Sequence, residues 1–297
     1  MKRIRVRVPA TTANLGPGFD CLGCALSMYA DFTCEIIPEG LEITGCSPEF
    51  RNADNLFVVA YRRMEDRLGI PHAGLRLDIH TDVPVSRGLG SSATLLAAGA
   101  YACNALNGDI LDKQAVLEIC NEIEGHPDNV APCVFGGMIT SLVQDGVPVS
   151  APVPVSGAIG FVALIPDFEV STKAARAVLP TQLSRADAVF NISRLGVLIR
   201  AFETGDLKLI GCAMDDRLHQ PYRRALIDEY DQAERAAIQA GAAAFCISGS
   251  GSTCLAVVDV HRREEIAQNI RETLKNSPHK WRIEALTVDR QGAHITP

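Results

Sequence analysis

A short loop rich in glycine and serine holds the residues whose types and spacing point most directly to chemistry. Its sequence is Pro84-Val85-Ser86-Arg87-Gly88-Leu89-Gly90-Ser91-Ser92-Ala93-Thr94. Glycine lets a backbone approach an anion closely, and a helix that begins in such a loop offers free N–H groups at the positive end of its dipole. Ser91 and Ser92 add hydroxyl groups that can bind a phosphate or a metal ion. This pattern predicts a cradle for phosphate groups.

Two common glycine-rich loops do not fit this stretch. No Gly-Lys-Ser or Gly-Lys-Thr follows, so the loop is not a P-loop. Ala93 stands where a dinucleotide-binding loop has its third glycine. A tight turn in which a serine caps the next helix is the simplest structural alternative.

A second cluster of polar residues ends the helix predicted for residues 112–124. It reads Glu124-Gly-His126-Pro-Asp128-Asn129. Carboxylate oxygens are the hard ligands that Mg²⁺ prefers, and a phosphate-binding protein without a P-loop needs such ligands from elsewhere in the chain. Simple capping of the helix end by these side chains is the structural alternative.

Three further segments carry polar groups that could face a ligand. Asn14 and Asp20 flank a Gly-Pro-Gly turn, and Thr172 and Arg176 lie four residues apart, hence on one face of a predicted helix. Arg223 follows a segment that contains carboxylates. The structural alternatives are Asx caps at the turn, a solvated helix and a surface ion pair. The residues alone leave both interpretations open.

Apolar periodicity indicates the elements that would position these residues. A strand over 75–79 leads into the phosphate-binding loop, and a helix over 95–106 leaves it. Residues 32–37 and 41–44 are expected to form a hairpin, and Asp54 is expected to cap the next helix. Further helices are predicted over 56–68, 112–124, 187–202, 207–214 and 262–274, and further strands over 159–165 and 281–288.

Composition excludes several classes of protein. The chain has 297 residues, of which 47% are hydrophobic and 21% charged, as is typical of a globular protein with one large or two medium domains. Its net charge of −7 argues against a general nucleic-acid binder and against an anionic membrane surface as partner. The alternating basic and apolar residues over 1–8 predict a first strand rather than a signal peptide.

The positions of the cysteines indicate the redox environment of the protein, and a local change in composition indicates a domain boundary. The ten cysteines lie in apolar runs, which indicates buried thiols in a reducing, cytoplasmic compartment. The pair Cys21 and Cys24 has no second pair or nearby histidine that would complete a zinc site. Residues 88–108 carry no charge but are rich in alanine, glycine and serine, so a buried helix is expected rather than a membrane span. A Pro- and Val-rich stretch predicts a boundary between domains at 1–155 and 156–297.

The motifs resemble those of a known enzyme family. The string Pro-x-x-x-Gly-Leu-Gly-Ser-Ser-Ala, which starts at Pro84, is similar to the ATP loop of the GHMP small-molecule kinases. Residues 9–20 resemble the amino-terminal signature of the homoserine kinase branch, and residues 124–129 resemble a short-loop form of its motif. Residues 241–258 resemble the third GHMP motif, with Ser252 where relatives often have proline. The resemblance spans nearly the whole chain.

The resemblance implies a fold and an activity. The fold would be α+β, the GHMP kinase fold, with an amino-terminal domain similar to ribosomal protein S5 domain 2 and a ferredoxin-like carboxy-terminal domain. The active site would lie in the cleft between them. The implied enzyme is a phosphotransferase that uses ATP and Mg²⁺ to convert L-homoserine to O-phospho-L-homoserine for threonine biosynthesis. No nucleic-acid or membrane partner is implied, the location would be cytoplasmic, and a homodimer is compatible with the family.

The resemblance also implies roles for individual residues. The loop Pro84–Thr94 would hold the phosphates of ATP, and Ser92, with Ser91 as the alternative, would bind Mg²⁺ together with Glu124. The implied catalytic residues are Asn129, Glu124 and Ser92, with Asn129 facing the phosphoryl acceptor. The residues implied to contact homoserine are Asn14, Asp20, His126, Asn129, Thr172, Arg176 and Arg223, of which Asp20 suits the ammonium group and the arginines suit the carboxylate.

Some alternatives stay open. Glu118 is a rival metal ligand, because relatives with a longer loop space their glutamate further from the asparagine. Some GHMP kinases use an aspartate base where this chain has Asn129, whose amide cannot take a proton, and Asp128 is the alternative base. The protein could also phosphorylate a different small alcohol, or be a non-catalytic relative that binds a ligand and regulates.

Overall fold

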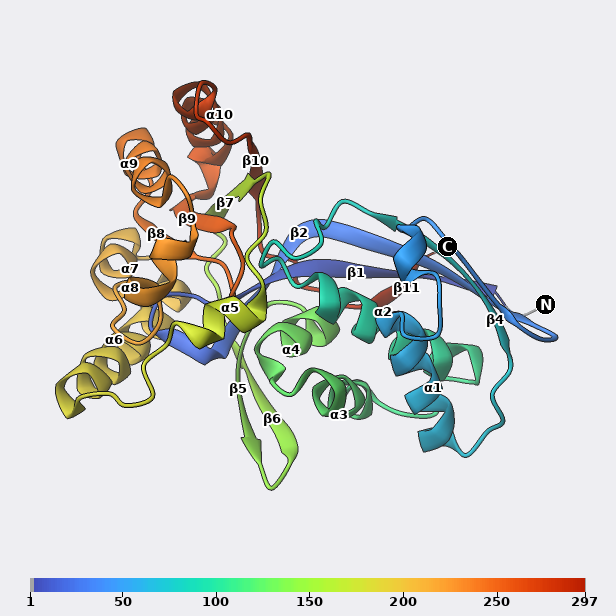
Figure 1. Ribbon diagram of the computed structural model, residues 1–297. Helices are drawn as coiled ribbons and strands as arrows, with labels where there is room; N and C mark the ends of the chain where they lie inside the picture. The colour runs from blue at the N-terminus through green and yellow to red at the C-terminus, as the bar shows by residue number, and fades with distance from the viewer. Residues whose placement is uncertain (1–2, 297) are drawn as a thin grey trace.

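The computed structural model describes residues 3–296 and contains two sheets (Figure 1). The first sheet is seven-stranded, with the order β11-β1-β2-β4-β3 and with β5 paired to β2 and β6. The second is four-stranded, with the order β10-β7-β9-β8. The strands are β1 (Arg3–Asn14), β2 (Gly18–Ile37), β3 (Leu41–Thr44), β4 (Gly74–Thr81), β5 (Met138–Gln144), β6 (Val147–Val153), β7 (Ile159–Pro166), β8 (Ala244–Ile247), β9 (Cys254–Asp259), β10 (Trp281–Leu286) and β11 (His294–Thr296).

Helices pack against both sheets. Helices α2 and α4 contact β1 and β2, while α1 and α3 pack against α2, and α10 covers β10 and β7 of the second sheet (Figure 1). The helices are α1 (Leu56–Leu68), α2 (Ser91–Leu106), α3 (Lys113–Glu124), α4 (Pro127–Phe135), α5 (Thr172–Ala177), α6 (Arg185–Thr204), α7 (Leu207–Ala213), α8 (Gln220–Arg223), α9 (Tyr230–Ala240) and α10 (Arg263–Leu274), with short 3-10 turns at Pro48–Phe50, Arg224–Leu226 and Val260–Arg262. Within residues 3–296, no helix has both the length and the apolar character that crossing a bilayer requires.

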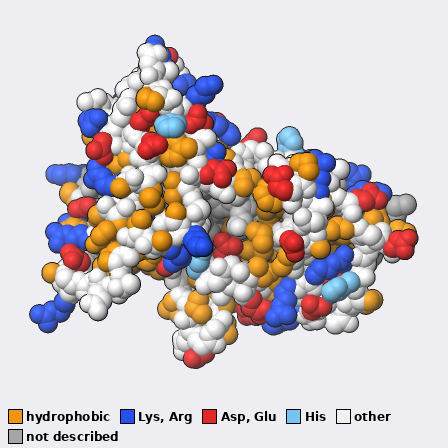
Figure 2. Space-filling view, viewed as in Figure 1, with side chains coloured by type: hydrophobic (Ala, Val, Ile, Leu, Met, Phe, Trp, Pro, Cys, Tyr) orange, Lys and Arg blue, Asp and Glu red, His pale blue; other side chains and the backbone are white. Residues whose placement is uncertain are grey.

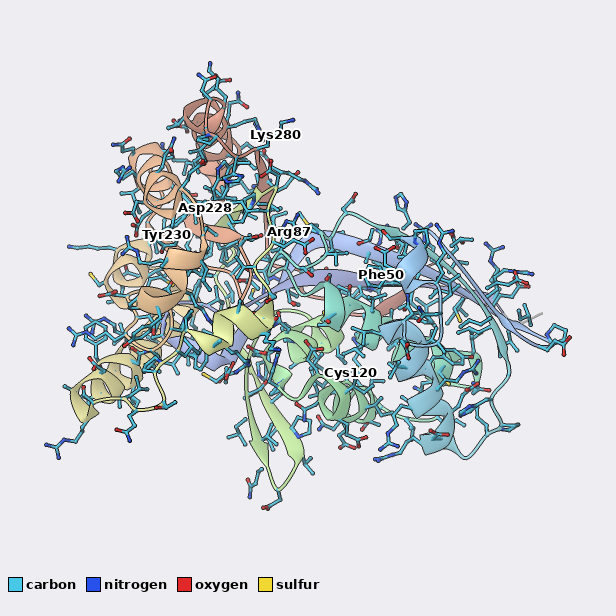
Figure 3. All side chains as sticks on the ribbon, in the orientation of Figure 1. Phe50, Arg87, Cys120, Asp228, Tyr230 and Lys280 are labelled. Atoms are coloured by element: carbon cyan, nitrogen blue, oxygen red, sulfur yellow. The ribbon has the colours of Figure 1, made fainter. Side chains whose placement is uncertain are left out.

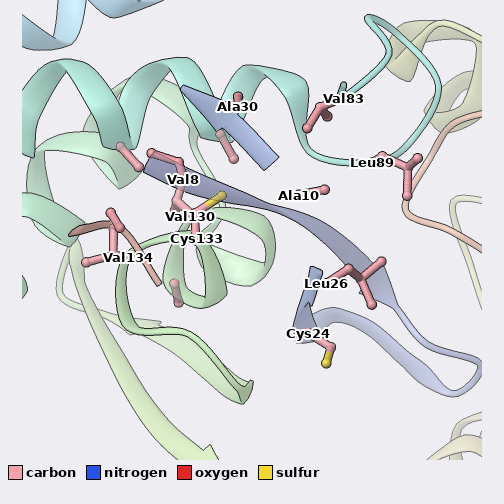
Figure 4. Packing of buried hydrophobic residues seen from close by; sticks show 14 of the residues in the cluster. Val8, Ala10, Cys24, Leu26, Ala30, Val83, Leu89, Val130, Cys133 and Val134 are labelled. Carbon is pink, nitrogen blue, oxygen red and sulfur yellow. The ribbon is translucent and has the colours of Figure 1, made fainter. Parts of the chain in front are cut away.

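The larger hydrophobic core lies between the first sheet and its helices. Val8 and Ala10 of β1, Leu26 of β2 and Val130 of α4 are fully buried in it (Figure 4). Leu89 of the glycine-rich loop is fully buried in the same cluster. The buried Leu89 side chain therefore anchors this loop to the core, which leaves the polar residues of the loop free to face away from the core.

The predicted hairpin between residues 32–37 and 41–44 is wrong. Strand β4 lies between these segments, because it pairs antiparallel with β2 from Ala30 to Ile37 and parallel with β3. The eight residues of β4 carry three apolar side chains on one face, and placing them beside the long strand β2 buries that face. The four residues of β3 are left at the edge of the sheet.

The predicted helices agree closely with the structure, and their caps differ in detail. Helix α1 has the predicted bounds, but Asn55 rather than Asp54 is its cap, since the Asn55 side chain accepts a hydrogen bond from the backbone N–H of Phe57. Helix α2 begins at Ser91 rather than at residue 95, so the two serines form its first turn. The dipole end of α2 thus lies within the predicted phosphate cradle.

The two halves of the chain are not separate in space. Strand β11 returns to the first sheet and pairs antiparallel with β1, for example through Ile295 and Val6. The segment beyond β10 therefore lies with the amino-terminal half. The domain boundary near residue 155 stays a prediction.

Two helical glycines have opposite roles that a stability measurement can separate. A Cβ at Gly99 of α2 would lie 2.1 Å from the backbone oxygen of Phe57 in α1, whereas nothing lies within 4 Å of a Cβ at Gly196 of α6. We predict that Gly99→Ala lowers the free energy of unfolding by about 1–3 kcal/mol through overpacking. Gly196→Ala should raise it by about 0.5–1 kcal/mol, because alanine restricts the unfolded chain. Urea unfolding measures both, and equal effects of the two variants would contradict this packing.

Candidate active site

A cavity lies where the glycine-rich loop, the turn before α4, the start of α5 and the loop between β8 and β9 meet. Figure 2 shows the surface hollowed between the two halves of the molecule. The cavity is lined by Asn14, Asp20, Ser86, Gly88, Gly90, Ser91, Ser92, Glu124, His126, Asp128, Asn129, Val170, Ser171, Thr172, Arg176, Arg223, Gly249, Ser250 and Gly251. It brings together every residue that the sequence analysis assigned to the metal and the acceptor. Their individual roles stay predictions.

The glycine-rich loop is shaped by close backbone contacts. Gly88 and Gly90 have φ of 80° and 70°, in the left-handed region that favours glycine. A Cβ at Gly88 would lie 2.3 Å from the backbone oxygen of Ser248, and a Cβ at Gly90 would lie 2.0 Å from Oγ1 of Thr11. The N-cap residue Gly90 makes no side-chain cap bond at the start of α2, and Gly90, Ser91 and Ser92 line the cavity. Such a helix start suits an anion.

The loop between β8 and β9, which belongs to the segment that resembles the third GHMP motif, braces the glycine-rich loop. The Ser248 hydroxyl donates to the backbone oxygen of Gly88 at 2.6 Å. The backbone N–H of Thr253 donates to the backbone oxygen of Arg87 at 3.0 Å. The hydroxyl of Ser252 donates to the backbone oxygen of Phe168 at 2.7 Å. A proline at position 252 could not make this last bond, so the departure from the family pattern ties one more segment to the site.

Glu124 and Glu118 have different surroundings. Glu124 ends α3 and lines the cavity, where burial raises the pKa of its carboxyl above the usual value and nearby His126 opposes this. Glu118 is ion-paired with Arg67 of α1, with its Oε2 2.9 Å from Nη2 of the arginine. A half-buried carboxylate without an arginine partner suits a cation, so Glu124 is a better candidate for the predicted metal ligand than Glu118.

The start of α4 holds three polar residues in fixed positions. The hydroxyl of Thr11 donates to Oδ1 of Asn129 at 2.9 Å, which leaves the amide NH₂ of Asn129 for the cavity. The carboxylate of Asp128 is 2% exposed and lies 2.9 Å from Nδ1 of His126. This hydrogen bond raises the pKa of His126. Asp128 is therefore engaged by the imidazole, which weakens its case as a free base.

Charged side chains from both halves meet at the other end of the cavity. Arg176 donates to both carboxylate oxygens of Asp20, at 3.0 and 3.1 Å. Arg223 is 2% exposed, and its Nε and Nη1 donate to the backbone oxygens of Ala175 and Gly249. Burial lowers the pKa of Arg223. The structure thus pairs Asp20 with Arg176, two residues that the sequence analysis had assigned to opposite ends of one ligand.

Backbone strain is concentrated in this cavity. Among residues 3–296, Asn14, Asp20 and Ser86 are three of the six non-glycine residues with positive φ, at 69°, 53° and 55°. Asn14 supports the first of these turns, since its Oδ1 accepts a hydrogen bond from the backbone N–H of Asp20. Residues in this region cost conformational energy and are frequent at functional sites.

Not every residue of the predicted phosphate loop lines the cavity. Leu89 and Ala93 are buried in the core, and Val85 and Thr94 line an adjoining cavity. Pro84 lines neither of the two cavities. The guanidinium of Arg87 lies against the residues after β7, outside the cavity (Figure 3).

The adjoining cavity was missed by sequence reasoning. It shares Ser86, Ser91 and Ser92 with the first cavity and continues from them over the first sheet. Its apolar lining includes Phe32, Cys46, Pro48, Phe50, Ile79, Val83, Val85 and Leu95. These residues come from separate segments with no motif of their own, so the sequence did not bring them together; Phe50 and Val85 are exposed members of the lining, and Figure 3 labels Phe50.

Comparison with known proteins identifies the family. The model of the GHMP kinases N terminal domain matches residues 55–137, and that of the GHMP kinases C terminal domain matches residues 198–276. The chain belongs to the GHMP kinase family. This confirms the predicted α+β GHMP kinase fold.

Relatives and solved structures agree with this GHMP kinase assignment. A homoserine kinase of Clostridium botulinum (strain ATCC 19397 / Type A) is 42% identical over 98% of both chains. The crystal structure of homoserine kinase from Cytophaga hutchinsonii ATCC 33406 is similar with a TM-score of 0.92 and 31% identity, and covers 100% of this chain and 98% of that one. L. major mevalonate kinase, at 18% identity and a TM-score of 0.75 over 96% of this chain and 95% of its own, shares the fold.

Exchange of the two glutamates tests the metal site. Loss of a residue that only supports a metal ligand typically costs about 10- to 100-fold in activity, so Glu124→Gln should lower kcat by at least this factor. Glu118→Gln should lower kcat only slightly. Because the folded-state pKa of Glu124 is raised, its charge destabilises the ligand-free fold once the pH exceeds that pKa. Ligand-free Glu124→Gln should therefore melt at or above the parent temperature at neutral pH. If Glu118→Gln is the inactive variant, Glu118 rather than Glu124 is the metal ligand.

Asn129 offers a second test, of orientation against proton abstraction. Asn129→Ala removes a group that Thr11 holds in place, and we expect kcat to fall by roughly 100-fold, typical of a misplaced reactant. Asn129→Asp should not be faster than the parent enzyme, because the carboxylate cannot donate the hydrogen bond by which the amide NH₂ would orient the acceptor. Rate profiles against pH measure this, and a faster Asn129→Asp with a new carboxylate-range dependence would show that a base is missing from the parent.

Proposed function

We propose that this GHMP kinase transfers the γ-phosphoryl group of ATP to the side-chain hydroxyl of L-homoserine, which gives O-phospho-L-homoserine for threonine biosynthesis. One observation carries the proposal: a single cavity joins an anion cradle at the start of α2 to the charged residues Asp20, Arg176 and Arg223. A zwitterionic alcohol with a short side chain fits these charges. The names of the relatives described above support the same substrate.

The nucleotide occupies both cavities in this proposal. Its triphosphate lies at Gly88 to Ser92, against the free helix start, and its base lies in the apolar adjoining cavity beside Phe50 and Val85. The two cavities share Ser86, Ser91 and Ser92, so one molecule can extend from one to the other. Catalysis of phosphoryl transfer consists mainly of such positioning and of charge neutralisation.

The residues present also fit Mg²⁺. Glu124 offers a half-buried carboxylate whose pKa is raised by burial, and Ser92 offers a hydroxyl at the start of α2 in the same cavity. Residues 3–296 contain no group of three or more His, Cys, Asp or Glu side chains placed to hold a metal. This suits Mg²⁺, which binds to one or two carboxylates and completes its shell with phosphates and water. When bound, the ion neutralises charge on the phosphates.

The acceptor is held by both of its charged groups. Asp20 binds the ammonium group, and Arg176 and Arg223 bind the carboxylate, so homoserine replaces the mutual ion pair of Asp20 and Arg176 with two ion pairs of its own. Mevalonate lacks an ammonium group and would leave Asp20 uncompensated. Asn14, His126 and Thr172 complete the walls of this end of the cavity.

Proton transfer needs no strong protein base in this arrangement. The amide of Asn129 donates toward the acceptor oxygen and orients it, since its own oxygen is occupied by Thr11. Asp128 is buried and bound to His126, so it does not face the acceptor as a free carboxylate. As the acceptor oxygen bonds to the γ-phosphorus and the bond from this phosphorus to ADP breaks, the hydroxyl proton passes to an oxygen of the transferred phosphoryl group.

A substrate panel tests the function. ADP release should be rapid with L-homoserine and slow with mevalonate, galactose and shikimate. Faster turnover with one of the other alcohols would replace homoserine as the substrate while keeping the kinase. Release with none of them, in protein that binds ATP, would favour a non-catalytic relative.

Arg176 provides the most specific prediction about substrate choice. Arg176→Lys keeps the charge but loses the planar guanidinium group with its paired donors. The resulting fall in kcat/KM for homoserine should correspond to about 1–3 kcal/mol of lost transition-state stabilisation, typical of a charged hydrogen bond. Arg176→Ala should lose more. The amino alcohol without the carboxylate should be a poor substrate of the parent and lose little further in Arg176→Ala. If the mutation costs the same with and without the carboxylate, Arg176 does not bind this group.

A further inference from the structure

The side chain of Arg87 connects two segments that the proposed reaction must hold together. Arg87 belongs to the glycine-rich loop, but its guanidinium extends to the second half of the molecule (Figure 3). Its Nε and Nη2 donate to the backbone oxygens of Pro166 and Asp167, each at 3.1 Å. Its Nη1 forms an ion pair with Glu169 at 2.8 Å. Only 15% of the Arg87 side chain is exposed, whereas its ion-pair partner Glu169 lies at the surface.

The partners of Arg87 lead directly into the acceptor end of the cavity. Pro166 ends β7 and residues 167–171 join it to α5, and Val170, Ser171 and Thr172 line the cavity. Arg176 follows on α5. The glycine-rich loop and the acceptor helix are thus separated by one guanidinium group and a few residues of backbone.

Other contacts hold residues 166–169 within the second half alone. The carboxylate of Asp167 binds Nδ1 of His279 at 3.0 Å and the backbone N–H of Lys280, and the backbone oxygen of Phe168 accepts from Ser252. Among these bonds, only that of Ser252 leads to the glycine-rich loop, and it does so indirectly, because the adjacent Thr253 donates its backbone N–H to the backbone oxygen of Arg87. The Arg87 side chain adds a direct link to that loop.

We propose that Arg87 is a positioning residue that couples the occupied phosphate loop to the placement of the acceptor helix, an inference that rests on the proposed function. In-line phosphoryl transfer requires the donor and acceptor atoms to be held about 3–3.5 Å apart, and a displacement of about 1 Å can cost roughly 100-fold in rate. A planar guanidinium with several fixed donors can hold two carbonyls and a carboxylate in one geometry, which a lysine cannot. Arg87 itself touches no reacting group.

Kinetics with a matched control test this role. Arg87→Ala should lower kcat by about 10- to 100-fold while the KM for ATP changes less than about three-fold, and Arg87→Lys should lie between this variant and the parent. The control is Arg282→Ala, because the Arg282 side chain also crosses between the halves, from β10 to the backbone oxygen of Asp82 at 3.1 Å, but its hydrogen bonds and ion pair go to Asp82 and Glu284 rather than to residues 166–169. It should resemble the parent. A loss confined to the KM for ATP, or equal losses in both alanine variants, would overturn the proposal.

Hydrogen exchange separates this inference from the proposed function. A non-hydrolysable ATP analogue with Mg²⁺ should slow amide exchange in both 84–94 and 167–177 of the parent, but only in 84–94 of Arg87→Ala. Undiminished protection of 167–177 in this variant would overturn the role of Arg87 and leave the kinase assignment untouched. No protection of 84–94 in the parent would instead overturn the nucleotide site, and with it both proposals.

Discussion

The arrangement of the site depends on one steric constraint, the contact between two backbones that leaves no room for a side chain on either. A Cβ at Gly251 would lie 2.2 Å from the backbone nitrogen of Gly88, and a Cβ at Gly88 would lie 2.8 Å from that of Gly251. The two loops come from different sheets, so this contact sets how closely the sheets approach. Since close-packed backbones do not deform gradually, the halves of the site have one well-defined separation. The hydrogen bond from Ser248 to Gly88 then fixes the direction of approach.

Within that frame, most charges of the cavity are compensated before any ligand arrives. Asp20 is paired with Arg176, and Asp128 with His126, while Arg223 is held by backbone oxygens. Glu124 has no arginine or lysine partner, and its burial is unfavourable for the charged form. In the ligand-free site Glu124 is therefore the carboxylate without an arginine or lysine partner, and under the proposed function it would bind the cation, while homoserine would replace the ion pair between Asp20 and Arg176.

Local features of the fold and site could be predicted from the sequence, whereas long-range ones could not. The bounds of α1 follow from apolar spacing, and the cradle follows from its glycines and serines, because both depend on neighbours in the chain. The position of β4 beside β2 depends on competition between distant strands, which periodicity does not encode. The apolar cavity beside Phe50 is built from several separate segments of the chain. The direction of the Arg87 side chain depends on its partner Glu169 in the second half. Family motifs supplied the residues that meet in the cavity, but not the ion pair between Asp20 and Arg176.

The return of β11 to the first sheet has a consequence for folding. Strand β1 lies between β2 and β11, so the edge of β1 that faces away from β2 lacks a partner at residues 5–7 until residues 294–296 pair with it. These partners lie far apart in the sequence, and contacts of such sequence separation form slowly. An exposed strand edge is a site for pairing with other chains. The pairing of β11 with β1 therefore protects this edge in the folded protein.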